Sequence, residues 1–296
     1  MIVDPREIKT MDLHAYMLSS IAPRPIAFAS TIDKNGIPNL SPFSFFNAFG
    51  SNPPIVVFSP ARRVRDNTIK HTLENIYDTK EVVINAVSYA MVHQQSLASC
   101  EYAKGVNEFE KAGFTAVASQ IVKPFRVKES PVQMECKVLE VKETGTQGGA
   151  GNLIICEIVL MHIDDNILDE HGKIDQHKID LVARLGGDWY CRASGDALFT
   201  VPKPLAKQTS IGVDALPQNI KQSHVLSGNN LGLLGNSESL PDGDEIKNFA
   251  ESEEGKIILR DLQIKDENVI HQAAKKLLEQ NKTREAFCLL MMSTMQ

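Results

Sequence analysis

The feature that most constrains the fold is a series of apolar, strand-like runs joined by short hairpin turns. The run from Ile26 to Ile32 ends in Asp33-Lys34-Asn35-Gly36, and Asn-Gly is a strong hairpin signal because both residues tolerate positive φ. A second run follows from Pro38 to Phe49, and runs at 133–143 and 152–164 flank the glycine-rich loop 145–151. This alternation of strand-like runs and short turns predicts a mainly β fold, an antiparallel barrel or sandwich, rather than a doubly wound parallel sheet.

The remaining segments predict two short strands and several peripheral helices. The strand candidates are 55–58 and 81–87. The helix candidates are 13–20 with Asp12 as its cap, 68–77, 91–104 and 108–112.

The composition changes after Pro202-Lys203-Pro204. Residues 205–245 are rich in Asn, Ser, Gly and Leu with little periodicity, so we expect an irregular segment there. Asp266 can then cap one amphipathic helix and Thr283 a second. The chain therefore divides into a sheet domain, 1–204, and an extension, 205–296, that ends in a small helical hairpin.

Composition excludes several classes of protein. The formal net charge of −6 argues against nucleic acid as the main partner, because such a partner requires a strong basic surface. The five cysteines include no C-x-x-C pair and predict free thiols in a reducing compartment. The first residues contain no apolar signal segment, and no apolar run approaches the ~20 residues that span a bilayer. We therefore expect a cytoplasmic protein without a membrane partner.

Common catalytic and nucleotide-binding motifs are absent. The chain contains no G-x-G-x-x-G after a strand, no phosphate loop, no H-E-x-x-H and no G-x-S-x-G. The glycines of 145–151 lack a following helix and are better interpreted as a hairpin turn. A metal site at His162, Asp164 and Asp165 is a weaker alternative, because at a strand end Asp165 points away from the face shared by His162 and Asp164, and no pattern identifies further ligands.

A group of polar residues follows the first strands. Ser30 and Thr31 end the first run, and the Asn-Gly hairpin would bring them near the hydroxyls and amides of 39–47. Arg62, Arg63 and Arg65 precede a predicted helix start, and guanidinium groups with a Thr hydroxyl and helix N–H groups suit a phosphate. Each element alone is explained by a core with surface arginines, but their combination and order favour a binding site.

Six segments carry a resemblance to a known family. In order along the chain they are PRPIAFAST, NLSPFSFFN, EVVINAV, ESPVQMECKV, HIDD and ARLGGDWY, and together they cover roughly residues 15–200. This series resembles the flavin reductase-like, FMN-binding split-barrel family. The resemblance implies a six-stranded split β-barrel that forms a homodimer and holds FMN in a cleft near the subunit interface.

The resemblance also implies site residues. The flavin contacts fall on Arg24, Ser30, Thr31, Ser44, Phe45, Phe46 and Asn47. The phosphate side falls on Arg65, Asn67 and Thr68. Many family members have Lys-Asp-Thr where this chain has the longer Arg65-Asp66-Asn67-Thr68. The segment Leu185-Gly186-Gly187-Asp188 is expected near the cleft, and the resemblance ends at about Phe199.

The function implied is an NAD(P)H-dependent flavin oxidoreductase. NAD(P)H would deliver hydride to flavin N5, and the reduced flavin would pass electrons to an acceptor, such as a protein carrier or an oxygenase. His162 is the one candidate for a protonating or substrate-facing group, against a structural histidine at a strand end. Three alternatives stay open: an FMN-bound electron carrier, a flavin-dependent oxygenase or oxidase, and a binding module whose extension recruits a partner.

Overall fold

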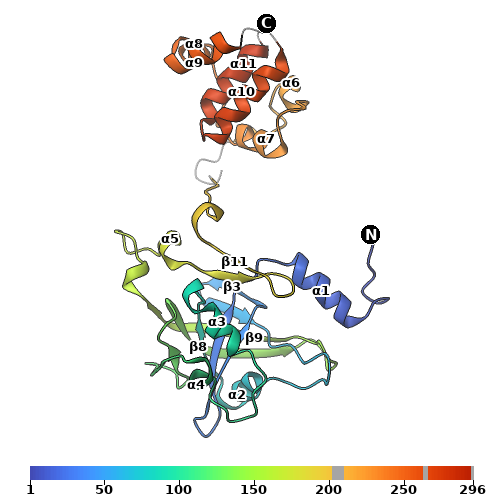
Figure 1. Cartoon of the computed structure of the whole chain (residues 1–296), viewed down its shortest axis with the longest axis vertical. Coiled ribbons are helices and arrows are strands. Elements are labelled where there is room, and N and C mark those ends of the chain that lie inside the picture. The colour runs from blue at the N-terminus through green and yellow to red at the C-terminus, as the bar shows by residue number, and fades with distance from the viewer. Residues whose placement is uncertain (202–209, 263–265, 295–296) are drawn as a thin grey trace. The chain divides into compact units, whose positions relative to one another are not determined.

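The computed structural model describes residues 1–201, 210–262 and 266–294. The chain forms two compact units, Met1–Phe199 and Thr200–Gln296, which we call the sheet unit and the helical unit and describe separately (Figure 1). The domain boundary predicted after residue 204 lies outside the described residues. Within the described ranges, no helix combines the length and apolarity needed to cross a bilayer.

The sheet unit is built on one seven-stranded antiparallel sheet. The strands pair in the order β2-β1-β5-β8-β9-β4-β3. Their bounds are β1 (Ala27–Ile32), β2 (Pro38–Phe43), β3 (Phe46–Ser51), β4 (Pro54–Phe58), β5 (Glu81–Asn85), β8 (Val132–Glu143) and β9 (Asn152–Ile163). The prediction of a mainly antiparallel β fold is confirmed.

The prediction of one strand across 38–49 is wrong, and the sheet has seven strands where the resemblance implied six. The run breaks at Ser44-Phe45 into β2 and β3, which occupy opposite edges of the sheet. Three peptide steps of 3.8 Å hold the Cα atoms of Phe43 and Phe46 within about 11 Å. The two edges therefore meet at this point and the sheet curls, although no β2–β3 ladder closes it.

Both predicted hairpins are present. In the first, Gly36 has φ +84°, and Asp33 Oδ1 accepts hydrogen bonds from Asn35 N (2.8 Å) and Ile37 N (2.9 Å). The second joins β8 and β9 through the glycine-rich loop, as the sequence predicts.

Strand β1 lies between β2 and β5, and all six of its residues are buried. Ala27 and Ala29 belong to one apolar cluster, with Phe58 and Ile84. Phe28 belongs to a second cluster on the other face, packed edge-on against Phe114 at 5.3 Å between ring centroids. A strand covered on both faces explains the uninterrupted apolar run at 26–32.

The peripheral elements of the sheet unit differ from the predictions mainly at their ends. The helices are α1 (Thr10–Ser20), α2 (His71–Thr79), η1 (Tyr89–Met91), α3 (Val92–Leu97), α4 (Glu108–Ala112), η2 (Asp165–Ile167), α5 (Gln176–Ile179) and η3 (Gly195–Ala197). Two further hairpins are formed by β6 (Ala116–Val117) with β7 (Arg126–Val127) and by β10 (Val182–Arg184) with β11 (Tyr190–Arg192).

Two of these differences are at the starts of helices. Helix α1 begins at Thr10, so Asp12 lies in its first turn and does not cap it. Helix α2 begins at His71 rather than 68, because Asp66 Oδ1 accepts from Thr68 N (3.0 Å) and Thr68 Oγ1 (2.6 Å). Asn67 between them has φ +57°, which a helix does not allow.

The helical unit contains more than the predicted helical hairpin. The hairpin itself, α10 (Glu267–Glu279) and α11 (Thr283–Thr294), is present, and Asp266 caps α10 as predicted. The segment predicted to be irregular contains α6 (Gln218–Lys221), α7 (Gly228–Gly235) and part of α8 (Gly243–Glu251), and α9 (Glu253–Asp261) follows. These helices enclose a core of their own, in which Ile220, Leu234, Phe287 and Leu290 are fully buried.

Candidate functional site

An open cleft lies where the two edges of the curled sheet meet. It has a volume of about 470 Å³ and is lined by Ser44, Phe45, Phe46 and Asn47 on one side and by 20–25, including Arg24, on the other. Its size falls within the range of small-molecule sites in proteins. The structure thus brings together five of the residues predicted to contact a flavin.

The Arg24 guanidinium organises this cleft. It donates to the carbonyl oxygens of Leu18, Ile21 (2.6 Å) and Leu185 (2.8 Å), and its Nε lies 3.4 Å from Ser44 Oγ. The side chain is buried, and burial, followed by the charge of Arg184, lowers its pKa. Because four of its five N–H groups are used within the protein, Arg24 acts mainly to position the cleft wall.

The segment Ser44–Asn47 leads into β3, an edge strand with polar backbone groups open to a ligand. Asn47 Oδ1 accepts from Ala48 N (2.8 Å), whereas Asn47 Nδ2 has no acceptor in the described parts of the chain. Phe45 O accepts from Ser59 N (2.9 Å). This bond connects the cleft to the segment that leads to the three predicted phosphate contacts.

Those contacts lie in one compact turn, residues 62–68, which we call the arginine loop. Arg62 Nε donates to Asn67 Oδ1 (2.7 Å), and Arg63 donates to Thr68 Oγ1 (2.7 Å). Arg65 pairs with Glu101 and with Asp66, and its side chain is 67 % exposed, against 17 % for Arg63. Arg65 therefore has the guanidinium that an incoming anion reaches most easily.

Charges around the arginine loop are balanced within the protein. The Thr68 hydroxyl and amide, followed by Arg65, hold the pKa of Asp66 well below its usual range. Hydrogen bonds from Arg65 and Arg63 lower the pKa of Glu101. Both carboxylates are therefore ionised at neutral pH, and a phosphate would have to replace exposed carboxylates as the partner of Arg65.

The β8–β9 hairpin loop, residues 144–151, is attached to the arginine loop. Gly149 N donates to Arg62 O (2.9 Å), Arg62 N donates to Ala150 O (2.8 Å), and Asn67 Nδ2 donates to the Thr146 carbonyl (3.0 Å). A Cβ on Gly148 would lie 2.9 Å from the carbonyl oxygen of Val64. Glycine is thus required for this close approach, a role that the glycine-rich pattern alone does not predict.

Helix α1 runs along the same face and joins its two ends. Its first residue, Thr10, packs on Gly149 of the hairpin loop. Its middle residue His14 meets the Phe45 ring edge-on, with centroids 6.2 Å apart. Its last turn contacts the β10–β11 hairpin, which Figure 1 shows beside α1. The sequence predicted this helix but gave no sign that it borders the cleft.

Ser30 and Thr31 are not part of the cleft. Both are fully buried in β1. Thr31 Oγ1 accepts from Asn75 Nδ2 of α2 (3.1 Å), and Ser30 Oγ has no hydrogen-bond partner among the described residues. Because β1 is covered on both faces, their flavin contacts stay a prediction that this structure does not support.

His162 does not line the cleft either. Its Nε2 lies 2.7 Å from Oε1 of the fully buried Glu135. Glu135 also accepts from the backbone N–H groups of Gln120 (2.8 Å), Ile121 (2.6 Å) and Val122 (3.0 Å). This geometry favours a structural role for His162. Within the described ranges, no cluster of three His, Cys, Asp or Glu side chains could hold a metal ion.

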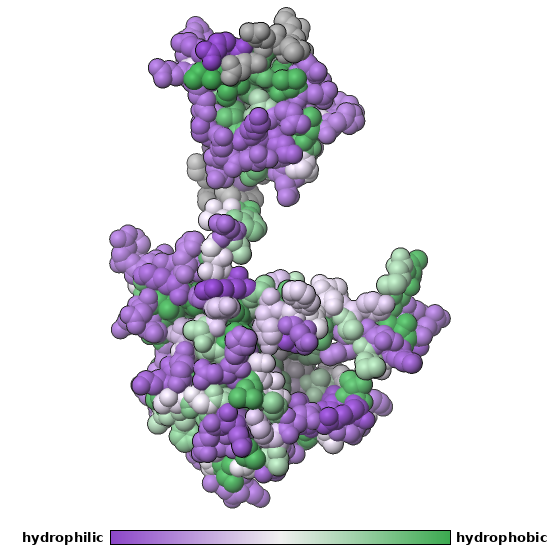
Figure 2. Space-filling view, viewed as in Figure 1, coloured by the Kyte–Doolittle hydropathy of each residue, from purple (hydrophilic) through white to green (hydrophobic). Residues whose placement is uncertain are grey.

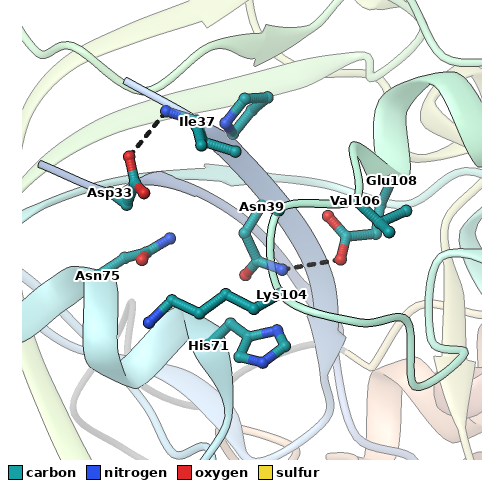
Figure 3. A pocket seen from close by; sticks show the side chains of 10 residues that line it. Asp33, Ile37, Asn39, His71, Asn75, Lys104, Val106 and Glu108 are labelled. Carbon is teal, nitrogen blue, oxygen red and sulfur yellow. Dashed lines mark hydrogen bonds between the residues drawn. The ribbon is translucent and has the colours of Figure 1, made fainter. Parts of the chain in front are cut away.

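A second, much smaller cavity lies between β2, α2 and α4 (Figure 3). Its volume is about 20 Å³, enough for about one water molecule. The buried Glu108 carboxylate accepts from Asn39 Nδ2 and from Leu40 N, both at 3.0 Å. Burial raises the pKa of Glu108. This carboxylate covers edge groups of β2, so the cavity is best explained as structural.

Comparisons with known proteins agree with this architecture. An uncharacterised protein of Aquifex aeolicus is 39 % identical over 189 residues, which are 64 % of this chain and 94 % of that protein. Nitrilotriacetate monooxygenase component B from Bacillus cereus is 26 % identical, with a TM-score of 0.63 over 68 % of this chain and 98 % of that structure. A Shewanella frigidimarina protein assigned as a flavin reductase with a split barrel domain is 29 % identical, with a TM-score of 0.57 over 69 % of this chain and 99 % of that structure.

The model of the flavin reductase like domain matches residues 18–178, more than half of the chain. This range contains the lining of the cleft, the arginine loop and the β8–β9 hairpin. The chain therefore belongs to the flavin reductase-like family.

Proposed function

We propose that this protein is an FMN-binding oxidoreductase that takes electrons from NAD(P)H and passes them to an acceptor. The observation that carries the proposal is the cleft of about 470 Å³ formed by Arg24 and Ser44–Asn47. It lies in a chain of the flavin reductase-like family and is connected through Phe45 and Ser59 to the arginine loop.

The residues present fit such a cofactor. The open backbone edge and the Asn47 amide offer hydrogen bonds to the polar edge of a planar ring. At the phosphate end of the cofactor, Arg65 offers its guanidinium, because its present partners Asp66 and Glu101 are exposed and can be replaced. When bound, FMN supplies the hydride-accepting and one-electron chemistry. The protein binds and orients it, and hydride transfer requires no protein acid or base.

A comparison of FMN with riboflavin tests this placement. We expect the wild-type protein to bind FMN more tightly than riboflavin, and Arg65→Ala to weaken FMN about tenfold or more while leaving riboflavin unchanged. The matched control is Arg6→Ala, because Arg6 is also exposed and pairs with a single acidic residue, Asp4. Equal losses for FMN and riboflavin would show that the arginine loop does not bind the phosphate.

The acceptor is proposed to be a separate protein, such as an oxygenase. The likeness to nitrilotriacetate monooxygenase component B supports this choice over a self-contained oxygenase. An electron carrier that does not use NAD(P)H is the second candidate. Anaerobic mixing with NADH and NADPH separates the two, because only a reductase is reduced within the time of a turnover.

A homodimer is also part of the proposal. Helix α1 has no buried residue, although it carries Met11, Tyr16 and Met17, all more than 40 % exposed. An isolated helix of this length is marginal in water and needs a packing partner. In Figure 2, hydrophobic residues, coloured green, are visible on the surface of the sheet unit near the N-terminus of the chain, where Figure 1 places α1. Sedimentation should give a dimer that Met17→Glu weakens and that Leu139→Glu, an exposed control on β8, does not.

A further inference from the structure

The chain has a single tryptophan, Trp189, and its side chain is 75 % exposed. It lies in the turn of the β10–β11 hairpin, where Trp189 N donates to Gly186 O (3.2 Å) and Leu185 N donates to Trp189 O (2.9 Å). Indole is the largest apolar side chain and is seldom left this exposed. Its position therefore requires an explanation.

The hairpin is fixed to the wall of the cleft. Arg24 and Arg184 exchange two backbone hydrogen bonds of 2.9 Å. The Arg24 guanidinium donates to Leu185 O (2.8 Å) and also reaches Ser44 Oγ. The Arg24 guanidinium thus contacts both Ser44 of the cleft wall and Leu185 of the hairpin turn. Leu185 is the residue whose N–H donates to the Trp189 carbonyl.

Glycine lets the turn come close to helix α1. A Cβ on Gly186 would lie 3.1 Å from Ser19 Cα, so the two backbones are in direct contact. Ile21, which follows α1 and lines the cleft, is 60 % exposed. The turn that carries the exposed indole therefore packs on the end of α1, next to residues 20–25 of the cleft wall.

The hairpin is also stiff. The Arg184 guanidinium packs over the Tyr190 ring at 4.6 Å and donates to Gly187 O (2.8 Å). Arg192 packs over Tyr89 at 3.9 Å while it pairs with Asp180. An aromatic group on such a support loses little conformational entropy when a flat ligand stacks on it.

We propose that Trp189 stacks on the aromatic ring of the second substrate, the small molecule that exchanges electrons with the cofactor in the cleft. This inference rests on the proposed function. The ligand is a planar heterocycle, either the nicotinamide ring of the donor or the ring of a free flavin that carries electrons on to the separate acceptor protein. Both offer the π face that an exposed indole binds.

Trp189→Leu and Trp189→Phe test the proposal, with Phe199→Leu as a control for an equally exposed aromatic group outside the hairpin. On the FMN-loaded protein, calorimetry with NAD⁺ and NADP⁺ measures donor binding without turnover. Anaerobic stopped-flow then measures reduction by NADH and NADPH and reoxidation by free FMN. Because Trp189 is exposed, its replacement should leave folding and the FMN dissociation constant unchanged.

We expect Trp189→Leu to raise the dissociation constant of one of these second substrates about tenfold, Trp189→Phe to raise it less, and Phe199→Leu to leave it unchanged. A loss with nicotinamide nucleotides identifies the donor as the stacked ring, and a loss with free FMN identifies the acceptor. Unchanged binding of all of them, or a loss of affinity for the cofactor itself, would overturn the proposal. Failure of the wild-type protein to bind FMN would instead refute the proposed function, before any variant is compared.

Discussion

Glu135 is predicted to be a major electrostatic support of the sheet unit. It is fully buried, and burial alone would raise its pKa. The backbone N–H of Gln120, then His162 and two further N–H groups, outweigh burial and lower the pKa to about 2, from an ordinary 4.5. At about 1.4 kcal/mol per pH unit, this difference corresponds to roughly 3 kcal/mol of stability at neutral pH.

Glu135→Gln removes this contribution and turns an amide NH₂ toward groups that are already donors. We therefore expect a loss of about 3 kcal/mol in the free energy of unfolding at pH 7. The pKa of Glu135 is lower in the folded protein than in the unfolded chain. The carboxylate therefore stabilises the fold fully above about pH 5.5, and this stabilisation is lost as the pH falls toward 2. The difference in the free energy of unfolding between wild type and Glu135→Gln should therefore be smaller at pH 3.5 than at pH 7, by about 1.4 kcal/mol.

Urea unfolding followed by near-UV circular dichroism suits this test, because the single tryptophan and all five tyrosines of the chain belong to the sheet unit. Glu140→Gln, at an exposed position on the same strand, is the control and should change stability by less than about 0.5 kcal/mol. The reasoning would be refuted if Glu135→Gln were as stable as the wild type at pH 7. It would also be refuted if the difference in their free energies of unfolding did not become smaller in acid. Turnover of the folded His162→Ala variant decides the role of His162. Lost turnover with FMN still bound would indicate a catalytic role, and unchanged turnover would indicate a structural one.

Three further predictions follow from other parts of the molecule. Burial lowers the pKa of His271, so the helical unit should lose stability as the pH falls below about 6.5, and His271→Gln should remove this dependence in urea titrations followed by circular dichroism. Gly148→Ala should displace the arginine loop and weaken FMN binding several-fold in a titration, whereas Gly145→Ala, with only ordinary contacts, should not. Burial raises the pKa of Cys156 to about 12, so a thiol reagent should modify exposed Cys100 in the folded protein and Cys156 only after unfolding.

The sequence predicted the parts of the fold that local chemistry determines. Asn35-Gly36 and the loop 145–151 specify their hairpins through residues that tolerate positive φ, and Asp266 specifies the start of α10. The cleft residues Arg24 and Ser44–Asn47 were found through the resemblance, because their partners lie far away in the sequence.

The parts that were missed depend on tertiary contacts or on weak local signals. Nothing within 38–49 marks the break at Ser44-Phe45, which exists because two sheet edges meet there. Alternation cannot assign a face to Ser30 in a strand buried on both sides. Glu101 approaches Arg65 across 36 residues of sequence, without a pattern to predict it. Helix α8 was detectable, since Asp242 and Glu245 form a capping box.

The central claim is that the cleft binds FMN and that NAD(P)H reduces it there. The most direct test is an absorbance spectrum of the purified protein, with FMN added if needed, followed by anaerobic NADH and NADPH. We predict flavin bands that stay with the protein and bleach rapidly with at least one nucleotide. Flavin bands that resist both nucleotides would contradict the reductase proposal, and a protein that binds no flavin on titration would contradict the whole account of the cleft.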